Sequence, residues 1–244
     1  MTTSRRRSVW LLGLLLLATA LIAAGCNTGV AERAAEGKLR RRLPEIIGPA
    51  EQYDVDIRAS SDLSVMEGRL RTITIEGRQV RVAHTWPVDH ILVVLDRVRV
   101  NLEKETLQSV GAARFQVTIY PATLVGYLEN DEENLRDAQI HLEEGKLTVT
   151  GRYLLMGLWT SFRVSGTLEL LDHSRIGFRT RGASAAGLPV PARIVRHLEQ
   201  RLNPVLDVSD TLLPIELTRV EVRPEGVVVS GIPHLDGTSL LGAR

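Results

Sequence analysis

Two stretches of this 244-residue chain decide its fold class: IHLEEGKLTVTG at residues 140–151 and VEVRPEGVVVSG at residues 220–231. Both have the order strand, turn with an acidic residue and a glycine, strand, glycine, and apolar and polar residues alternate in these strands except at the three valines 227–229. A period of two is typical of a β-strand with one buried and one solvated face. Two such runs around a short turn predict a β-hairpin. The repeated hairpin therefore predicts an antiparallel sheet.

The same alternation predicts further strands along most of the chain. It recurs at residues 54–58, 70–82, 97–102, 114–120 and 163–170, and a continuous apolar run occupies residues 91–95. Within the second of these stretches, Glu76-Gly77 predicts a hairpin turn. The small residues and two prolines at 182–191 predict a loop, which contains Ser184.

Three stretches show helical spacing instead. Apolar residues recur every four positions from Ala31 to Leu43 and the stripe extends to Ile47, where Gly48-Pro49 ends it. Residues 121–128 begin with a proline, which suits a first helical turn, and residues 194–202 carry the third apolar stripe. Because strands outnumber helices and are joined by short turns, we expect an α+β fold with about three helices packed on an antiparallel sheet.

The N-terminus has the order of a lipoprotein signal peptide. Three arginines precede the uncharged stretch Val9–Ala24, which is short for a membrane span of ~20 residues. The sequence Ala23-Ala24-Gly25-Cys26 resembles a bacterial lipobox, and its cysteine is the only one in the chain. We expect residues 1–25 to be removed, Cys26 to be acylated, and residues 26–244 to form one domain anchored on the extracytoplasmic side of a membrane, in the cell envelope or periplasm. A retained anchor helix and a leader cut elsewhere are the alternatives.

Composition and charge exclude several classes of protein. A hydrophobic content of 44% is too high for a disordered chain, and one cysteine cannot form an internal disulfide or a cysteine-based metal site. Loss of the three leader arginines leaves 27 Lys and Arg against 29 Asp and Glu, a formal charge of −2, which does not favour nucleic acid. The local exception is Lys38, Arg40, Arg41 and Arg42, which suit lipid head groups or a solvated helix face.

The polar residues form no catalytic or metal-binding motif. None of the six histidines belongs to an HExxH sequence, and His84, Asp89 and His90 flank Trp86-Pro87 in an expected loop. Ser184 does not lie in a GxSxG sequence. We therefore expect no metal, no cofactor and no enzymatic activity. An envelope enzyme acting on lipid or glycan is kept as a third hypothesis, because triads assemble from distant positions.

One apolar stretch, Tyr153–Trp159, does not alternate. Such a stretch is either a strand buried on both faces or a surface that meets another apolar molecule. On the second interpretation, the lipid-binding candidates are Leu154, Leu155, Met156, Leu158 and Trp159, and the tryptophan suits a membrane interface.

The order of these elements over residues 30–232 resembles the LmeA-like phospholipid-binding family of bacteria. The resemblance rests on an Ala-Glu-rich helix that leads into Leu43-Pro44-Glu45-Ile46-Ile47-Gly48, on the block 113–119 followed by Leu124 and Tyr127-Leu128, on the hairpin 144–151, on Gly187-Leu188-Pro189-Val190-Pro191, and on 217–222 with Gly226 and Gly231.

The resemblance implies an envelope protein that binds phospholipid, with lipid transfer as a further expectation. It also implies a tubular lipid-binding fold, in which a strongly curved antiparallel sheet wraps around a long helix and leaves an apolar cavity. We expect lipid tails against Leu39, Leu43 and Ile47 and the head group near the basic run. The competing hypothesis is a non-catalytic structural module whose core is filled.

Overall fold

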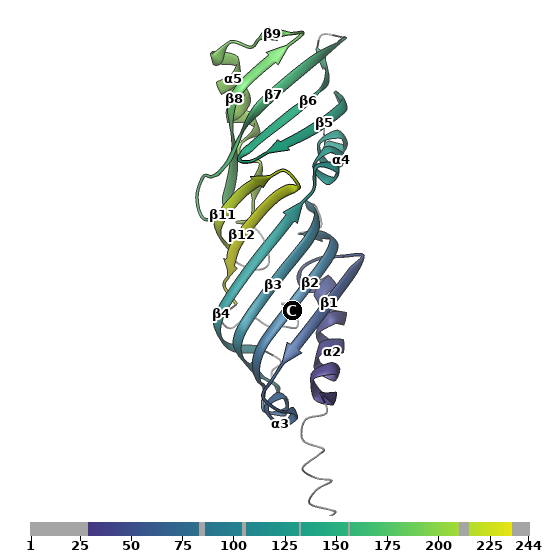
Figure 1. The fold of residues 1–244 in the computed structure, drawn as a ribbon, viewed down its shortest axis with the longest axis vertical. Helices are drawn as coiled ribbons and strands as arrows, with labels where there is room; N and C mark the ends of the chain where they lie inside the picture. The colour runs from purple at the N-terminus through teal and green to yellow at the C-terminus, as the bar shows by residue number, and fades with distance from the viewer. Residues whose placement is uncertain are drawn as a thin grey trace, which may run out of the picture.

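The computed structural model describes residues 29–82, 86–103, 106–131, 133–155, 157–209 and 215–235. Most of these residues lie in antiparallel strands (Figure 1). Sheet A has the strand order β1-β2-β3-β4-β12-β11, and sheet B has the order β10-β8-β7-β6-β5 with β9 paired to β8. The antiparallel, β-rich α+β fold is confirmed.

The element bounds are as follows. The described part of the chain contains the helices α2 (Val30–Ile46), α3 (Asp62–Met66), α4 (Pro121–Asp131) and α5 (Ala192–Leu202). Sheet A contains β1 (Gln52–Arg58), β2 (Arg69–Val82), β3 (Trp86–Asn101), β4 (Thr106–Ile119), β11 (Ile215–Arg223) and β12 (Gly226–Pro233). Sheet B contains β5 (Leu135–Glu143), β6 (Lys146–Leu155), β7 (Leu158–Leu170), β8 (Arg175–Ala185), β9 (Leu188–Pro189) and β10 (Leu206–Asp207).

The strands form two sheets, whereas the sequence predicted one. The sheets lie end to end in an elongated molecule, with the β11–β12 hairpin between them, and neither sheet closes on itself (Figure 1). The three predicted helices are present, and the short helix α3 was missed because five residues are too few to show a helical period. The wrapping of a sheet around a long helix stays a prediction.

Helix α2 covers the edge of sheet A that β1 forms. Leu43 is only 1% exposed and lies in a core with residues of β1 to β4. The Glu36 carboxylate accepts a hydrogen bond from the backbone N–H of Ile57 at 3.0 Å, and Glu32 accepts one from Ala59 at 2.7 Å. An edge strand exposes backbone donors that would otherwise pair with another chain, so these two carboxylates stand in for a seventh strand.

Helices α4 and α5 also hydrogen-bond to strand backbone through glutamate side chains, here in sheet B. Glu129 of α4 accepts a hydrogen bond from the N–H of Ala138 in the edge strand β5 at 2.9 Å. Glu199 of α5 accepts one from the N–H of Thr180 in β8. Beside it, the Asn203 amide donates to the carbonyl of Phe178 and accepts from its N–H, as a neighbouring strand would. Helix side chains thus pair with backbone donors of β1 in sheet A and of β5 and β8 in sheet B.

The predicted turn at Gly77 is wrong, because β2 runs through it without interruption. Gly77 pairs with Tyr53 on one side and with Ile91 on the other. A Cβ atom there would lie 2.6 Å from Ile91 and 2.8 Å from Tyr53, so the glycine is required by close packing across the sheet. Gln79, at φ 49°, then reverses the alternation, which places Val80 in the same core.

The loop predicted around Ser184 is also wrong in part. Ser184 belongs to β8 and pairs with Arg163 and Pro189, so β8 and β9 form a hairpin with a tight turn at Ala186-Gly187. Both turn residues have a positive φ, which suits the primed turns of two-residue hairpins. Small side chains here therefore mark a narrow hairpin.

Asp89, which was assigned to a loop, lies in β3 and joins three elements. It is 6% exposed. Its carboxylate accepts hydrogen bonds from Gln79 Nε2 of β2 at 2.9 Å, Thr123 Oγ1 of α4 at 2.7 Å and the Tyr120 N–H at 2.6 Å. The N-terminus of a helix favours a negative charge, so Asp89 caps α4 from a neighbouring strand.

We predict that Asp89→Ala lowers the free energy of unfolding by about 3 kcal/mol, because it removes three hydrogen bonds that converge on a buried carboxylate. Urea denaturation of the variant measures this loss. The matched control is Asp54→Asn on the exposed face of β1, which should change stability by less than ~0.5 kcal/mol. Equal effects of the two substitutions would contradict the capping role.

The buried phenol of Tyr53 leads us to predict that the protein loses stability at alkaline pH. Its phenol donates a hydrogen bond to the Gly48 carbonyl at 2.8 Å, and burial raises its pKa to about 12. The unfolded phenol ionises near pH ~10, so its contribution is complete below that pH and is lost as pH rises toward 12. We expect the stability difference between the wild type and Tyr53→Phe to fall by about 1 kcal/mol between pH 8 and pH 11. A pH-independent difference in urea titrations would contradict this.

Candidate functional site

The apolar residues of sheet A share one face. Directly paired residues in antiparallel strands point to the same side. The pairing connects one row across all six strands, in the order Val55, Ile75, Val93, Phe115, Gly231, Leu217. A neighbouring row runs Ile57, Ile73, Leu95, Ala113. We call this side of the sheet the apolar face.

The apolar face is buried over most of its area and is less covered at one place in β3 and β4. Val55 and Ile75 are each 6% exposed and Leu217 is 1% exposed, whereas Val93 and Phe115 between them are half-buried. Ala113, next to them on β4, is half-buried as well. We call Val93, Ala113 and Phe115 the central patch. Ile91, Leu95 and Val117, on the same face of β3 and β4, are 2%, 4% and 5% exposed, so the central patch is a less covered part of an otherwise buried face.

Helix α2 borders this face with the three lipid-binding candidates of the N-terminal region. Leu43 is buried in the core, and Leu39 and Ile47 are partly buried against it. Val93, Ala113 and Phe115 are also partly buried and pack against the same core cluster as Leu43. The structure therefore brings the first group of candidates together with the apolar face.

The predicted head-group residues lie on the same helix. Lys38, Arg40 and Arg41 are exposed, and Arg42 is half-buried and forms an ion pair with Glu45 at 3.2 Å. Because successive helical residues are rotated by about 100°, the basic residues lie on the sides of α2 that flank its buried stripe. A phosphate held by these side chains would sit at the border between apolar face and solvent.

The second group of candidates lies elsewhere. Leu154 and Leu155 end β6, while Leu158 and Trp159 begin β7 and are 72% and 37% exposed. Of Leu155 only the backbone is described, and Met156 lies outside the described residues. The interpretation of this stretch as a strand buried on both faces is wrong, because it forms the tip of the β6–β7 hairpin. This tip is at the opposite end of the molecule from α2, so the structure does not bring the two groups together (Figure 1).

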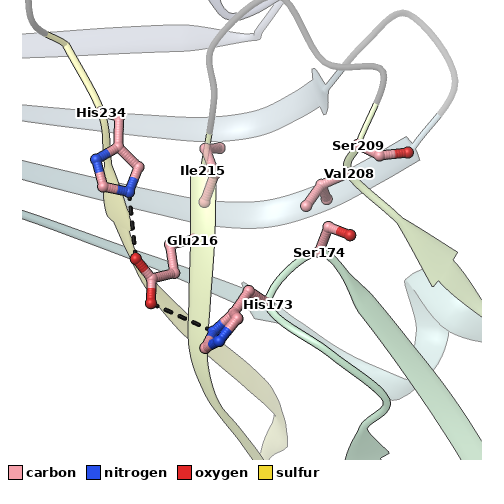
Figure 2. A pocket seen from close by; sticks show the side chains of 7 residues that line it. All are labelled: His173, Ser174, Val208, Ser209, Ile215, Glu216 and His234. Carbon is pink, nitrogen blue, oxygen red and sulfur yellow. Dashed lines mark hydrogen bonds and ion pairs between the residues drawn. The ribbon is translucent and has the colours of Figure 1, made fainter.

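A pocket of about 540 Å³ lies where the two sheets meet. Figure 2 shows Glu216 of β11 between His173, in the β7–β8 turn, and His234, which follows β12. His173 Nδ1 and His234 Nε2 each lie 3.2 Å from a different carboxylate oxygen of Glu216. The sequence did not suggest this cluster, because its three residues are far apart in the chain and follow no short motif.

The chemistry of this pocket is that of a surface ion-pair cluster. The Ser174 and Ser209 hydroxyls donate to Asp172 and Asp207, so they are not aimed at the histidines. Arg175 lowers the pKa of Asp172, and the Ser209 hydrogen bonds lower that of Asp207. Within the described ranges, no three His, Cys, Asp or Glu residues are arranged to hold a metal ion.

The predicted leader and its cysteine cannot be placed. Residues 1–25 and Cys26 lie outside the described residues, as does His84. In the part of the chain that the structure describes, no helix is both long enough and apolar enough to cross a bilayer.

Comparison with known proteins identifies the family. The sequence model of the LmeA-like phospholipid-binding family matches residues 27–232. No significant match was found among curated proteins or among solved structures. The match spans both sheets, the four described helices and the apolar face. The family is described by what it binds and not by a reaction. The chain therefore belongs to the LmeA-like phospholipid-binding family.

Proposed function

We propose that this protein binds a phospholipid, or a related acyl lipid, with its acyl chains along the apolar face of sheet A. The half-buried central patch carries this proposal, together with the family match over residues 27–232. Each buried methylene of an acyl chain contributes ~0.8 kcal/mol, so a chain lying across Val93, Ala113 and Phe115 would supply most of the binding energy. Binding sites for such ligands are concave and mostly apolar, as expected for a twisted sheet.

The head group then lies at the basic end of α2. Leu39 and Ile47 border the apolar face from the helix, and Lys38, Arg40 and Arg41 continue the same helix toward solvent. Arginine binds phosphate through two parallel hydrogen bonds, which makes this run suitable for a phospholipid. In this arrangement the sheets curve around α2 and the lipid, as in a tubular lipid-binding fold.

We further propose that the protein acts from a membrane of the cell envelope. Residues 1–25 would serve as an export signal, Cys26 as the acylated first residue, and 26–244 as one lipid-binding domain. Two or three acyl chains on one cysteine would hold the domain on the membrane stably, since a single chain gives only marginal attachment. The proposed function is lipid binding and transfer without catalysis, and it is supported by the half-buried central patch and the family match.

We predict that Ala113→Trp lowers lipid binding at least fivefold, because the indole fills the space beside Val93 and Phe115. Uptake of a fluorescent phosphatidylglycerol by the full-length chain, followed by gel filtration, measures this. The matched control is Ala112→Trp, which places the same side chain on the other face of β4, where Ala112 is exposed. Any lipid bound through the N-terminal region is common to both variants.

The two variants also separate a lipid site from a filled core. A filled core would make Ala113→Trp strongly destabilising through overpacking, while Ala112→Trp would be neutral. If Ala113→Trp fails to fold, Ala113→Leu provides a smaller increase in volume for the same comparison. Unchanged lipid uptake in folded Ala113 variants would contradict the proposed position of the acyl chains.

We predict that the mature protein begins at Cys26. Mass spectrometry of the protein isolated from its own membranes should show a chain without residues 1–25 and with two or three acyl groups on the first peptide. Cys26→Ser should leave the protein unprocessed or release it from the membrane fraction. A mature chain that begins elsewhere and carries no acyl group would contradict the anchor.

A further inference from the structure

The end of sheet B that lies farthest from α2 exposes apolar side chains. Leu158 and Trp159 form the tip of the β6–β7 hairpin, and Leu188, at the start of β9, is 71% exposed. Ile194, in the first turn of α5, is 45% exposed. These elements meet at the same end of the molecule (Figure 1). We call Leu158, Trp159, Leu188 and Ile194 the distal tip.

The segments that form the distal tip are strongly basic. Residues 152–165 and 180–196 contain no aspartate and no glutamate. They contain the exposed arginines Arg152, Arg163, Arg181, Arg193 and Arg196, of which Arg152 forms an ion pair with Asp137 of β5. The expected mature chain has a formal charge of −2, so this excess of positive charge is a local property of one end.

The indole of Trp159 forms a cation–π contact with an arginine side chain. The guanidinium of Arg136, in β5, lies 4.5 Å from the centre of the indole ring. Arg152 pairs with Ser161 in the β6–β7 ladder, and Arg163 pairs with Thr150, which places both arginines on the same face as Trp159. An indole stacked on a guanidinium group, with further arginines on the same face, suits the boundary between acyl chains and head groups.

We infer that the distal tip docks on an anionic lipid surface. Soluble proteins rarely leave several large apolar side chains exposed at one place without a partner. Leucine and isoleucine fit the acyl region, tryptophan fits the interface, and exposed arginines such as Arg163 and Arg193 fit negatively charged phosphate groups. An acidic protein would supply the charge but not the apolar layer that Leu158 and Leu188 need, so the lipid surface is the occupant that matches both features.

This docking surface is distinct from the lipid site proposed on sheet A. The two lie at opposite ends of the elongated molecule, so a chain held through its N-terminus would present the distal tip to a lipid surface away from α2 (Figure 1). The inference does not depend on the apolar face holding lipid. The two proposals therefore fail in different experiments.

An environment-sensitive dye at the distal tip tests the inference. We would attach nitrobenzoxadiazole to Leu158→Cys in the full-length Cys26→Ser chain and add vesicles of phosphatidylcholine with 30% phosphatidylglycerol. The control position is Met66→Cys in α3, which is 70% exposed and lies at the α2 end of sheet A. We expect a blue shift and a several-fold increase in emission at position 158 and no change at position 66. A response at position 66 alone, or at neither position, would overturn the inference.

The charge requirement is tested by the same readout. Arg163→Glu and Arg193→Glu should each weaken vesicle binding about fivefold, because each arginine near an anionic surface contributes on that order. Arg33→Glu, on the exposed side of α2, is the matched control and should have no effect. Equal binding to vesicles of pure phosphatidylcholine would overturn the electrostatic part. Uptake of fluorescent phospholipid should be unchanged in the Arg163 and Arg193 variants, which separates failure of docking from failure of the lipid site.

Discussion

The pairing of open strand edges is the constraint on which the rest of this structure depends. The carboxylates of Glu32 and Glu36 accept hydrogen bonds from backbone N–H groups at the β1 edge of sheet A, and those of Glu129 and Glu199 do the same in sheet B. The remaining edge strand, β11, is paired by turns of sheet B, since the Gly145 N–H donates to Val222 and the Leu217 N–H donates to His173. Helix α2 is held at the β1 edge and buries Leu43 in the core, while Val93, Ala113 and Phe115 are left half-buried. The proposed site for an acyl chain rests on this half-exposure.

Most strands and three helices could be predicted from periodicity, because one face of each is buried and the other is solvated. The predictions were wrong where glycine or other small residues serve packing or a hairpin and not a turn or a loop. Gly77 was interpreted as a turn, although its small size serves the packing of Tyr53 and Ile91 across the sheet. The small residues around Ser184 were interpreted as a loop, although they form a hairpin. The division into two sheets had no local signal, because it depends on which hairpins meet in space.

The candidate site shows a similar division. The apolar stripe of α2 is visible in its four-residue spacing, and the structure places Leu39, Leu43 and Ile47 at the border of the apolar face. The stretch 154–159 was grouped with that site because both are apolar, but strand connectivity carries it to the opposite end of the molecule (Figure 1). The role of Asp89 could not be seen either, because its three donors come from Gln79, Tyr120 and Thr123, which only the fold brings together.

The central claim is that an acyl chain lies on the central patch of sheet A, and photo-cross-linking tests it most directly. The full-length chain would be loaded with a phospholipid that carries a diazirine in its acyl chain, irradiated, digested and mapped by mass spectrometry. The account predicts adducts on peptides that contain Val93, Ala113 and Phe115, and their loss when an excess of unlabelled phospholipid is present. Adducts confined to the distal tip or to the N-terminal 26 residues, or no adduct that unlabelled phospholipid displaces, would contradict it.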